Sequence, residues 1–191
     1  MALTLFSRTR TATEPEHTPQ PRPETGETWQ PEGVHVTQRF LGLAGAVVLV
    51  YTADAGANGT YYAVACLGCS YRTRSKTDRD HYIASEQAGG EIANAHAAQC
   101  RALPRDLPAR PDDDTARELV LRRLNWERRS DYDATVYLTA FHLDRLALQR
   151  STQWIEEELQ RLADEEPELL TAKRRRYGTG TEFTIVRSPQ R

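Results

Sequence analysis

The stretch Thr60-Tyr-Tyr-Ala-Val-Ala-Cys-Leu-Gly-Cys69 joins a run of strand-forming residues to a Cys-x-x-Cys motif. The run from Thr60 to Ala65 predicts a strand that ends at the first cysteine. Gly68 permits a tight turn, so Cys66 and Cys69 can direct both sulfurs toward one centre. Two thiolates at this spacing are typical of half of a tetrahedral metal site.

The residues before this strand predict its partner. Ala46-Val-Val-Leu-Val-Tyr51 is rich in β-branched residues, as strands are. The whole apolar stretch 41–51 is about half the length that a bilayer crossing needs, so we interpret it as a buried strand and expect no membrane segment. Residues 54–59 tolerate positive φ and suit a reversing loop. The two strands therefore predict a β-hairpin.

The residues after the motif predict a helix over 80–100, which Gly89-Gly90 would weaken or split. His96 and Cys100 are four residues apart, so they share one face of this helix. Two ligands from a knuckle and two from a helix complete a Cys₃His set of Cys66, Cys69, His96 and Cys100. Such a set leaves no open coordination position, which predicts a structural Zn²⁺ ion.

Two alternatives for the cysteines stay open. One is a redox Cys-x-x-Cys with an unrelated Cys100, and the other is three inert thiols. A thioredoxin-like motif begins a helix within a βαβ unit, whereas this motif ends a hairpin, which favours zinc. An odd number of cysteines and the lack of an apolar leader favour a reducing cytoplasm over secretion.

The composition limits what the whole chain can bind. Lys and Arg number 25 and Asp and Glu 27, so no overall charge draws the protein to nucleic acid or membrane. Apolar residues make up 39%, below the roughly 45–50% of ordinary domains. Residues 1–33 are Pro-rich and predict a disordered tail, in which Trp29 is a large apolar residue able to dock on the folded part. The Arg-rich and Ala-rich usage indicates a GC-rich bacterial genome.

Pro104, Pro108 and Pro111 mark a linker within residues 101–114. It divides the chain into a zinc-binding α+β module at 34–103, a linker at 104–114 and a second domain at 115–191. Thr115-x-x-Glu118 predicts a capping box that opens a helix over 116–129.

Residues 116–187 resemble a winged helix-turn-helix domain. Residues 136–138 resemble its first strand, and a second helix over 140–148 is capped by Thr139, with Leu143 and Leu146 inward. Residues 150–162 resemble the third helix, whose Ile155, Leu159 and Leu162 are spaced for burial. Residues 169–178 and 181–186 resemble the two wing strands, and the alternation in the second puts Phe183 and Ile185 on one face.

The resemblance implies binding of duplex DNA, with the third helix in the major groove and the wing on the backbone. It assigns that contact to two groups: Arg150, Thr152, Gln153 and Trp154 on the third helix, and Lys173, Arg174, Arg175 and Arg176 on the wing. One departure from the family is an acidic middle of the third helix, Glu156 to Glu158. Residues 113–191 hold 14 basic and 15 acidic residues, so this region is not basic overall.

No catalytic constellation emerges, because the chain has no phosphate loop, no recognisable triad and no dinucleotide fingerprint. The sequence therefore predicts an α+β protein, with a zinc module followed by a winged-helix-like domain, that is a non-enzymatic DNA-binding accessory or regulator of transcription. The alternative is a protein–protein adaptor that docks on a larger assembly or forms a homodimer. A redox protein using the Cys-x-x-Cys pair is the third possibility.

Overall fold

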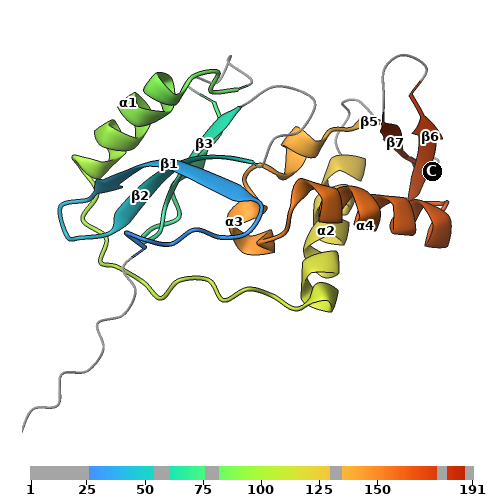
Figure 1. Cartoon of the computed structure of the whole chain (residues 1–191), viewed down its shortest axis with the longest axis horizontal. Coiled ribbons are helices and arrows are strands. Elements are labelled where there is room, and N and C mark those ends of the chain that lie inside the picture. The colour runs from blue at the N-terminus through green and yellow to red at the C-terminus, as the bar shows by residue number, and fades with distance from the viewer. Residues whose placement is uncertain (1–25, 54–60, 76–81, 130–134, 176–179, 188–191) are drawn as a thin grey trace, which may run out of the picture.

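The computed structural model describes residues 26–53, 61–75, 82–129, 135–175 and 180–187. It is a mixed α and β structure with a four-stranded sheet at one end and a three-stranded sheet at the other (Figure 1). The elements in chain order are β1 (Val34–Leu41), β2 (Val47–Ala53), β3 (Tyr62–Cys66), β4 (Arg72–Thr73), α1 (Glu86–Ala97), α2 (Asp113–Arg128), β5 (Thr135–Val136), η1 (Leu138–Phe141), α3 (Arg145–Leu148), α4 (Thr152–Glu165), β6 (Leu170–Arg174) and β7 (Thr181–Ile185).

The first sheet is antiparallel throughout, in the order β1-β2-β3-β4. The predicted hairpin of β2 and β3 is confirmed, although its loop at 54–59 lies outside the described residues. The edge strand β1 was not predicted, because its mixed polar sequence has a weak period and its register shifts between Val36 and Gln38.

Strand β2 is buried on both faces, which explains why its sequence shows no alternation of polar and apolar residues. Val48 and Val50 face α1, whereas Val47, Leu49 and Tyr51 pack on the opposite side. All five side chains are at most 1% exposed. A strand covered on both sides needs apolar residues at every position, as here.

Helix α1 is continuous, so Gly89-Gly90 does not split it, which was one of the two expected effects of this pair. Both glycines are buried on the face that packs against the sheet. A Cβ atom at Gly89 would lie 2.7 Å from Cγ1 of Val50 on β2. Close packing on the sheet therefore outweighs the roughly 1 kcal/mol by which a glycine weakens a helix. The helix is also shorter than the predicted range 80–100. It begins after Ser85, whose side chain accepts a hydrogen bond from the amide of Ala88, and it ends at Ala97.

The C-terminal half packs α2 and α4 against the sheet β5-β7-β6. Ile155, Leu159 and Leu162 are fully buried, and Phe183 and Ile185 lie on the buried face of β7, as predicted. The tip of the predicted wing is residues 177–181, of which 177–179 lie outside the described residues. None of the helices in the described part of the chain has the length and apolar run that a bilayer crossing requires.

Two local predictions in this half are wrong. Helix α2 begins at Asp113, and the carboxylate of Asp112 accepts from the amide of Thr115, so Thr115 is inside the first turn and does not cap the helix. The predicted second helix is two short pieces, η1 and α3, and Thr139 caps neither of them. The positive φ of Gln149 then ends α3 and redirects the chain into α4.

The two halves share a core. Leu146 and Leu143 point inward as predicted, but they pack on Leu49 and Tyr51 of the first sheet. Trp29 joins the same cluster, as its sequence position suggested. The Tyr51 hydroxyl donates to the His142 carbonyl at 3.1 Å across this contact.

The Pro-rich segment 101–112 contains no helix or strand and runs along one side of the molecule from α1 to α2 (Figure 1). Hydrogen bonds attach it to the C-terminal half. The Gln149 amide donates to the Pro108 carbonyl at 2.9 Å, and the Arg150 guanidinium donates to the Pro111 carbonyl at 2.6 Å. The segment is therefore bound to the surface that it crosses.

Candidate metal centre

The turn between β3 and β4 places the first two ligands. The Cys66 amide donates to the Tyr71 carbonyl at 2.9 Å, and the Tyr71 amide donates to the Cys69 sulfur at 3.4 Å. Gly68 lies between the two cysteines, where a Cβ atom would be 2.6 Å from the Leu103 carbonyl oxygen. Gly68 is thus needed for close packing, because any side chain there would push this turn away from the segment that follows α1.

The end of α1 places the other two ligands. His96 is in its last turn, and Cys100 follows just beyond it, with its amide donating to the His96 carbonyl at 2.9 Å. The Cys100 carbonyl accepts from the amide of Leu43 at 2.8 Å, which attaches this end of the helix to the β1–β2 turn. The ring of Tyr71 stacks on the His96 imidazole with centroids 4.0 Å apart. Three separate segments therefore meet at the four side chains.

The four ligand atoms lie within 4.8 Å of one another. The Cys66 and Cys100 sulfurs are 3.8 Å apart, and the Cys69 sulfur is 3.4 Å from Nε2 of His96. A tetrahedral ion with bonds to sulfur of about 2.3 Å and to nitrogen of about 2.0 Å would separate its ligands by roughly 3.5–3.8 Å. Cys66, Cys69, His96 and Cys100 could therefore bind one metal ion, and their separation is too long for a disulfide.

The protonation of the ligands depends on their surroundings. Burial raises the pKa of the Cys66 thiol to about 11. The amide of Ala102 lowers the pKa of Cys100, and burial lowers the pKa of His96. A neutral imidazole is the form that coordinates a metal, whereas a buried thiol must lose a proton to do so. Metal binding at this centre is therefore expected to release protons.

Comparison with known protein families, characterised proteins and solved structures finds no match to this chain. The function therefore rests on the chain's own residues.

The residues predicted to read DNA from the third helix do not form one exposed face. Arg150 is 3% exposed, and its guanidinium pairs with Asp113 at 2.8 Å, so little of this side chain is accessible to a ligand. Thr152 is also buried, and its hydroxyl accepts from Arg145 at 2.9 Å. Trp154 is half-buried against the core, which leaves Gln153 as the exposed member of this group. The sequence pattern did not reveal that the start of α4 is attached to α2.

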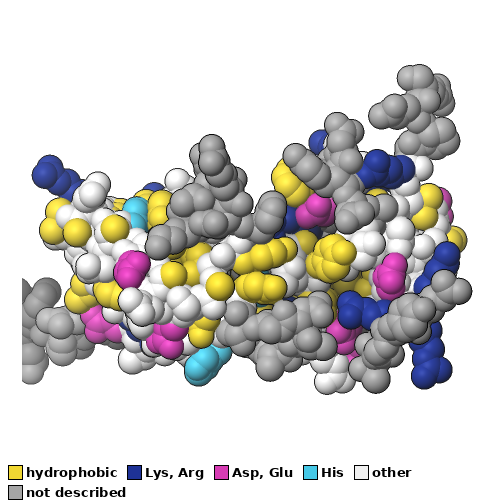
Figure 2. Space-filling view, turned by 90° about the horizontal axis from the view of Figure 1, so that it is seen from above, with side chains coloured by type: hydrophobic (Ala, Val, Ile, Leu, Met, Phe, Trp, Pro, Cys, Tyr) yellow, Lys and Arg dark blue, Asp and Glu magenta, His cyan; other side chains and the backbone are white. Residues whose placement is uncertain are grey.

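The residues predicted to form the wing are placed differently. Lys173 and Arg174 are exposed at the end of β6, while Arg175 is half-buried and Arg176 lies outside the described residues. Figure 2 shows Lys and Arg side chains gathering at the end of the molecule where β6 and β7 lie. Lys173 and Arg174 line a shallow hollow of about 410 Å³ together with Gln160 of α4.

Two further surfaces were not predicted. One is a cavity at the junction of the halves, lined by tyrosines that are far apart in the sequence. The other surrounds Trp126, which is 59% exposed on α2 beside Arg122 and Arg129. An exposed tryptophan on a helix that otherwise follows an apolar period was the available signal for the second. The first depends on contacts between distant segments, which no local pattern reveals.

Proposed function

We propose that the metal centre holds one structural zinc ion. Three thiolates and one imidazole are the donor set that Zn²⁺ prefers, and their spacing suits a tetrahedron. A complete set of four protein ligands leaves no position for water, so the ion stabilises the fold and is not a catalyst. Elemental analysis of freshly purified protein is expected to give one zinc per chain. A chain that folds fully with less than a molar equivalent of any metal contradicts the proposal.

We further propose that residues 113–187 form a winged helix-turn-helix. The order of α2, β5, η1 with α3, α4, β6 and β7 is helix, strand, helix, helix, strand, strand. The sheet order β5-β7-β6 supports the same assignment, since the first strand pairs beside the last. In this assignment β6 and β7 are the strands of the wing and α4 is the third helix.

The function that we propose is non-enzymatic binding of duplex DNA, mainly through the wing. The observation that carries it is the exposed pair Lys173 and Arg174 on β6, beside the open hollow under α4. The exposed face of α4 favours phosphate contact by the wing over deep insertion of the helix. That face carries Gln153, Glu156, Glu157, Gln160, Arg161 and Asp164, so acidic groups outnumber the one arginine there.

Fluorescence anisotropy with a blunt duplex tests this function. Affinity is expected to fall as salt rises, because phosphate contacts release counterions. Lys173→Gln with Arg174→Gln should weaken binding at low salt and reduce the slope of log K against log salt by about two. The matched control is Arg105→Gln with Arg122→Gln, which removes two other exposed arginines. Duplex binding that is absent at low salt, or equally sensitive to both pairs, contradicts the proposal.

The second candidate function is protein docking, in which the chain acts as an adaptor or a homodimer. Trp126 favours it, because tryptophan and arginine are enriched at the centres of protein interfaces. The acidic face of α4 is also more compatible with a protein than with DNA. Sedimentation analysis of the native chain and of Trp126→Ser tests the homodimer. A dimer that the substitution dissociates supports this candidate, and a monomer at all concentrations counts against self-association.

A further inference from the structure

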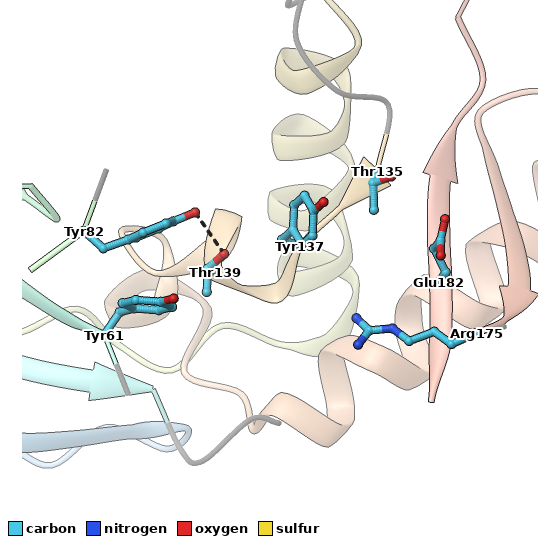
Figure 3. A pocket seen from close by; sticks show the side chains of 7 residues that line it. All are labelled: Tyr61, Tyr82, Thr135, Tyr137, Thr139, Arg175 and Glu182. Atoms are coloured by element: carbon cyan, nitrogen blue, oxygen red, sulfur yellow. Dashed lines mark hydrogen bonds between the residues drawn. The ribbon is translucent and has the colours of Figure 1, made fainter. Parts of the chain in front are cut away.

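A cavity of about 430 Å³ lies where the two halves meet. Tyr61, which precedes β3, and Tyr82, which precedes α1, reach into it from the first half. Tyr137, Arg175 and Glu182 enclose it from the second half. Figure 3 shows the hydroxyl ends of Tyr61 and Tyr82 on one side and the guanidinium of Arg175 reaching in from the other. The volume is that of a small-molecule site.

The first half presents a fixed wall to this cavity. The rings of Tyr61 and Tyr82 stack with centroids 4.3 Å apart, and the Tyr82 hydroxyl lies 3.4 Å from that of Thr139 (Figure 3). Arg74 holds the same corner, since its guanidinium donates to the Thr139 carbonyl at 3.1 Å and lies over the Tyr82 ring. This wall therefore offers tyrosine hydroxyl groups to the cavity, and its contacts with Thr139 join the two halves.

The second half presents a ring and two charges of opposite sign. Tyr137 lines the cavity and is 46% exposed. Arg175 supplies donors and Glu182 supplies acceptors. A simple anion would be repelled by the carboxylate, and a simple cation by the guanidinium. A planar group that has both donors and acceptors along its edge fits the pair better.

We propose that this junction cavity binds an unpaired nucleotide, with its base against Tyr137 and the edge of the base on Arg175 and Glu182. Bases outside a duplex are bound in this way, by stacking on aromatic rings and by hydrogen bonds along the base edge. The basic strand that carries Lys173 and Arg174 leads directly to Arg175, so the cavity lies beside the surface proposed for duplex DNA. This inference rests on the proposed function and names the end or junction of a strand as its target.

The test compares three probes on the full chain. Anisotropy measures a blunt duplex and the same duplex with a four-nucleotide overhang, and calorimetry measures each free nucleoside monophosphate. An overhang is expected to bind about tenfold more tightly than the blunt end, because stacking of a single base is strong enough for such a change. Binding of a free nucleotide with no gain from the overhang identifies the same chemistry from a soluble source. If the cavity instead binds a zwitterionic ligand, the overhang gives no gain in affinity over the blunt duplex and no free nucleotide binds.

Substitutions locate the effect in the cavity. Tyr137→Leu and Arg175→Gln should each remove most of the overhang preference, whereas Tyr137→Phe, which keeps the ring, should retain it. The matched controls are Trp126→Leu, which removes an exposed ring elsewhere, and Arg105→Gln. Arg175→Gln changes a half-buried side chain at the rim, so it keeps the test valid if Tyr137→Leu fails to fold.

The inference is overturned if the overhang binds no more tightly than the blunt duplex and no free nucleotide binds. It is also overturned if the gain survives in both Tyr137→Leu and Arg175→Gln. Its failure is distinguishable from failure of the proposed function. If the blunt duplex does not bind, the proposed DNA contact of the wing fails. If the overhang still binds and needs Tyr137, the proposed nucleotide site in the cavity stands.

Discussion

The two halves of this protein are stabilised in different ways. In the C-terminal half, a core of large aliphatic and aromatic side chains joins α2, α4 and the second sheet. In the first half, the layer between the sheet and α1 combines Val48, Val50, Val64 and Ile83 with five smaller side chains, those of Ala46, Ala93, Ala97, Cys66 and Cys100. Small side chains bury little apolar area, so this layer contributes less hydrophobic stabilisation. A metal ion bound by the four candidate ligands, as proposed, would add to the first half the stabilisation that apolar packing supplies in the other.

The largest expected effect comes from removing a ligand. Cys100→Ser should destabilise the first half by more than about 3 kcal/mol, because binding of a structural metal contributes directly to folding. Hydrogen exchange is expected to rise in β1 to β4 and α1 more than in α4. Cys100→His keeps a donor and is the control. Equal protection of the two halves in Cys100→Ser would remove the proposed difference between them.

A cavity in the other core gives the next largest effect. Leu159 is fully buried in α4, so Leu159→Ala is expected to cost about 2–5 kcal/mol. Bound metal per chain should stay unchanged under native conditions, as elemental analysis can show. Denaturation followed by tryptophan fluorescence, which reports mainly on Trp126 and Trp154 of the C-terminal half, and by release of the metal would then reveal whether the halves unfold together. Two separate transitions would show that the shared core around Leu146 couples them only weakly.

The contact between the halves is expected to be sensitive to acid. Burial and the charges of Arg145 and Arg74 lower the pKa of His142 from 6.5 to about 4, so the folded protein holds this ring neutral. The unfolded chain binds the proton more readily. The contribution to stability is therefore present above pH 6.5 and is lost as the pH falls toward 4, by about 2 kcal/mol between pH 7 and pH 5. Urea unfolding of wild type and His142→Phe at both pH values measures it, since the variant should lose about 2 kcal/mol less than wild type between pH 7 and pH 5.

The smallest effect concerns one hydrogen bond in the same contact. Tyr51→Phe removes the donor to the His142 carbonyl and should cost about 1–2 kcal/mol, because a buried acceptor loses its partner. Val48→Ala, on the opposite face of β2, is a useful comparison, since it changes the α1 side alone. Chemical denaturation of both variants, with hydrogen exchange in η1 and α3 as the local readout, checks this assignment. Unchanged exchange in those elements would contradict it.

The sequence predicted elements best where one local rule was sufficient. The hairpin, the four candidate ligands and the buried positions of α4 follow from period and spacing. The structure contains the hairpin, brings the four ligands together and buries the predicted positions of α4. The glycine pair in α1 was misjudged, because its packing on Val50 is a contact between distant segments. The same cause explains Arg150, whose partner Asp113 is 37 residues away. Proximity between separate elements is the information that a local pattern lacks.

The segment 101–112 has a consequence for how the protein would respond to a cut backbone. Its middle, around Arg105, is exposed and offers a protease an accessible peptide bond. The fragments on either side would still share the cluster of Tyr51, Leu146 and Trp29. A chain nicked there is therefore expected to remain one particle in solution. Two separately produced pieces that divide at this point would make a split protein, which reassembles only when both are folded.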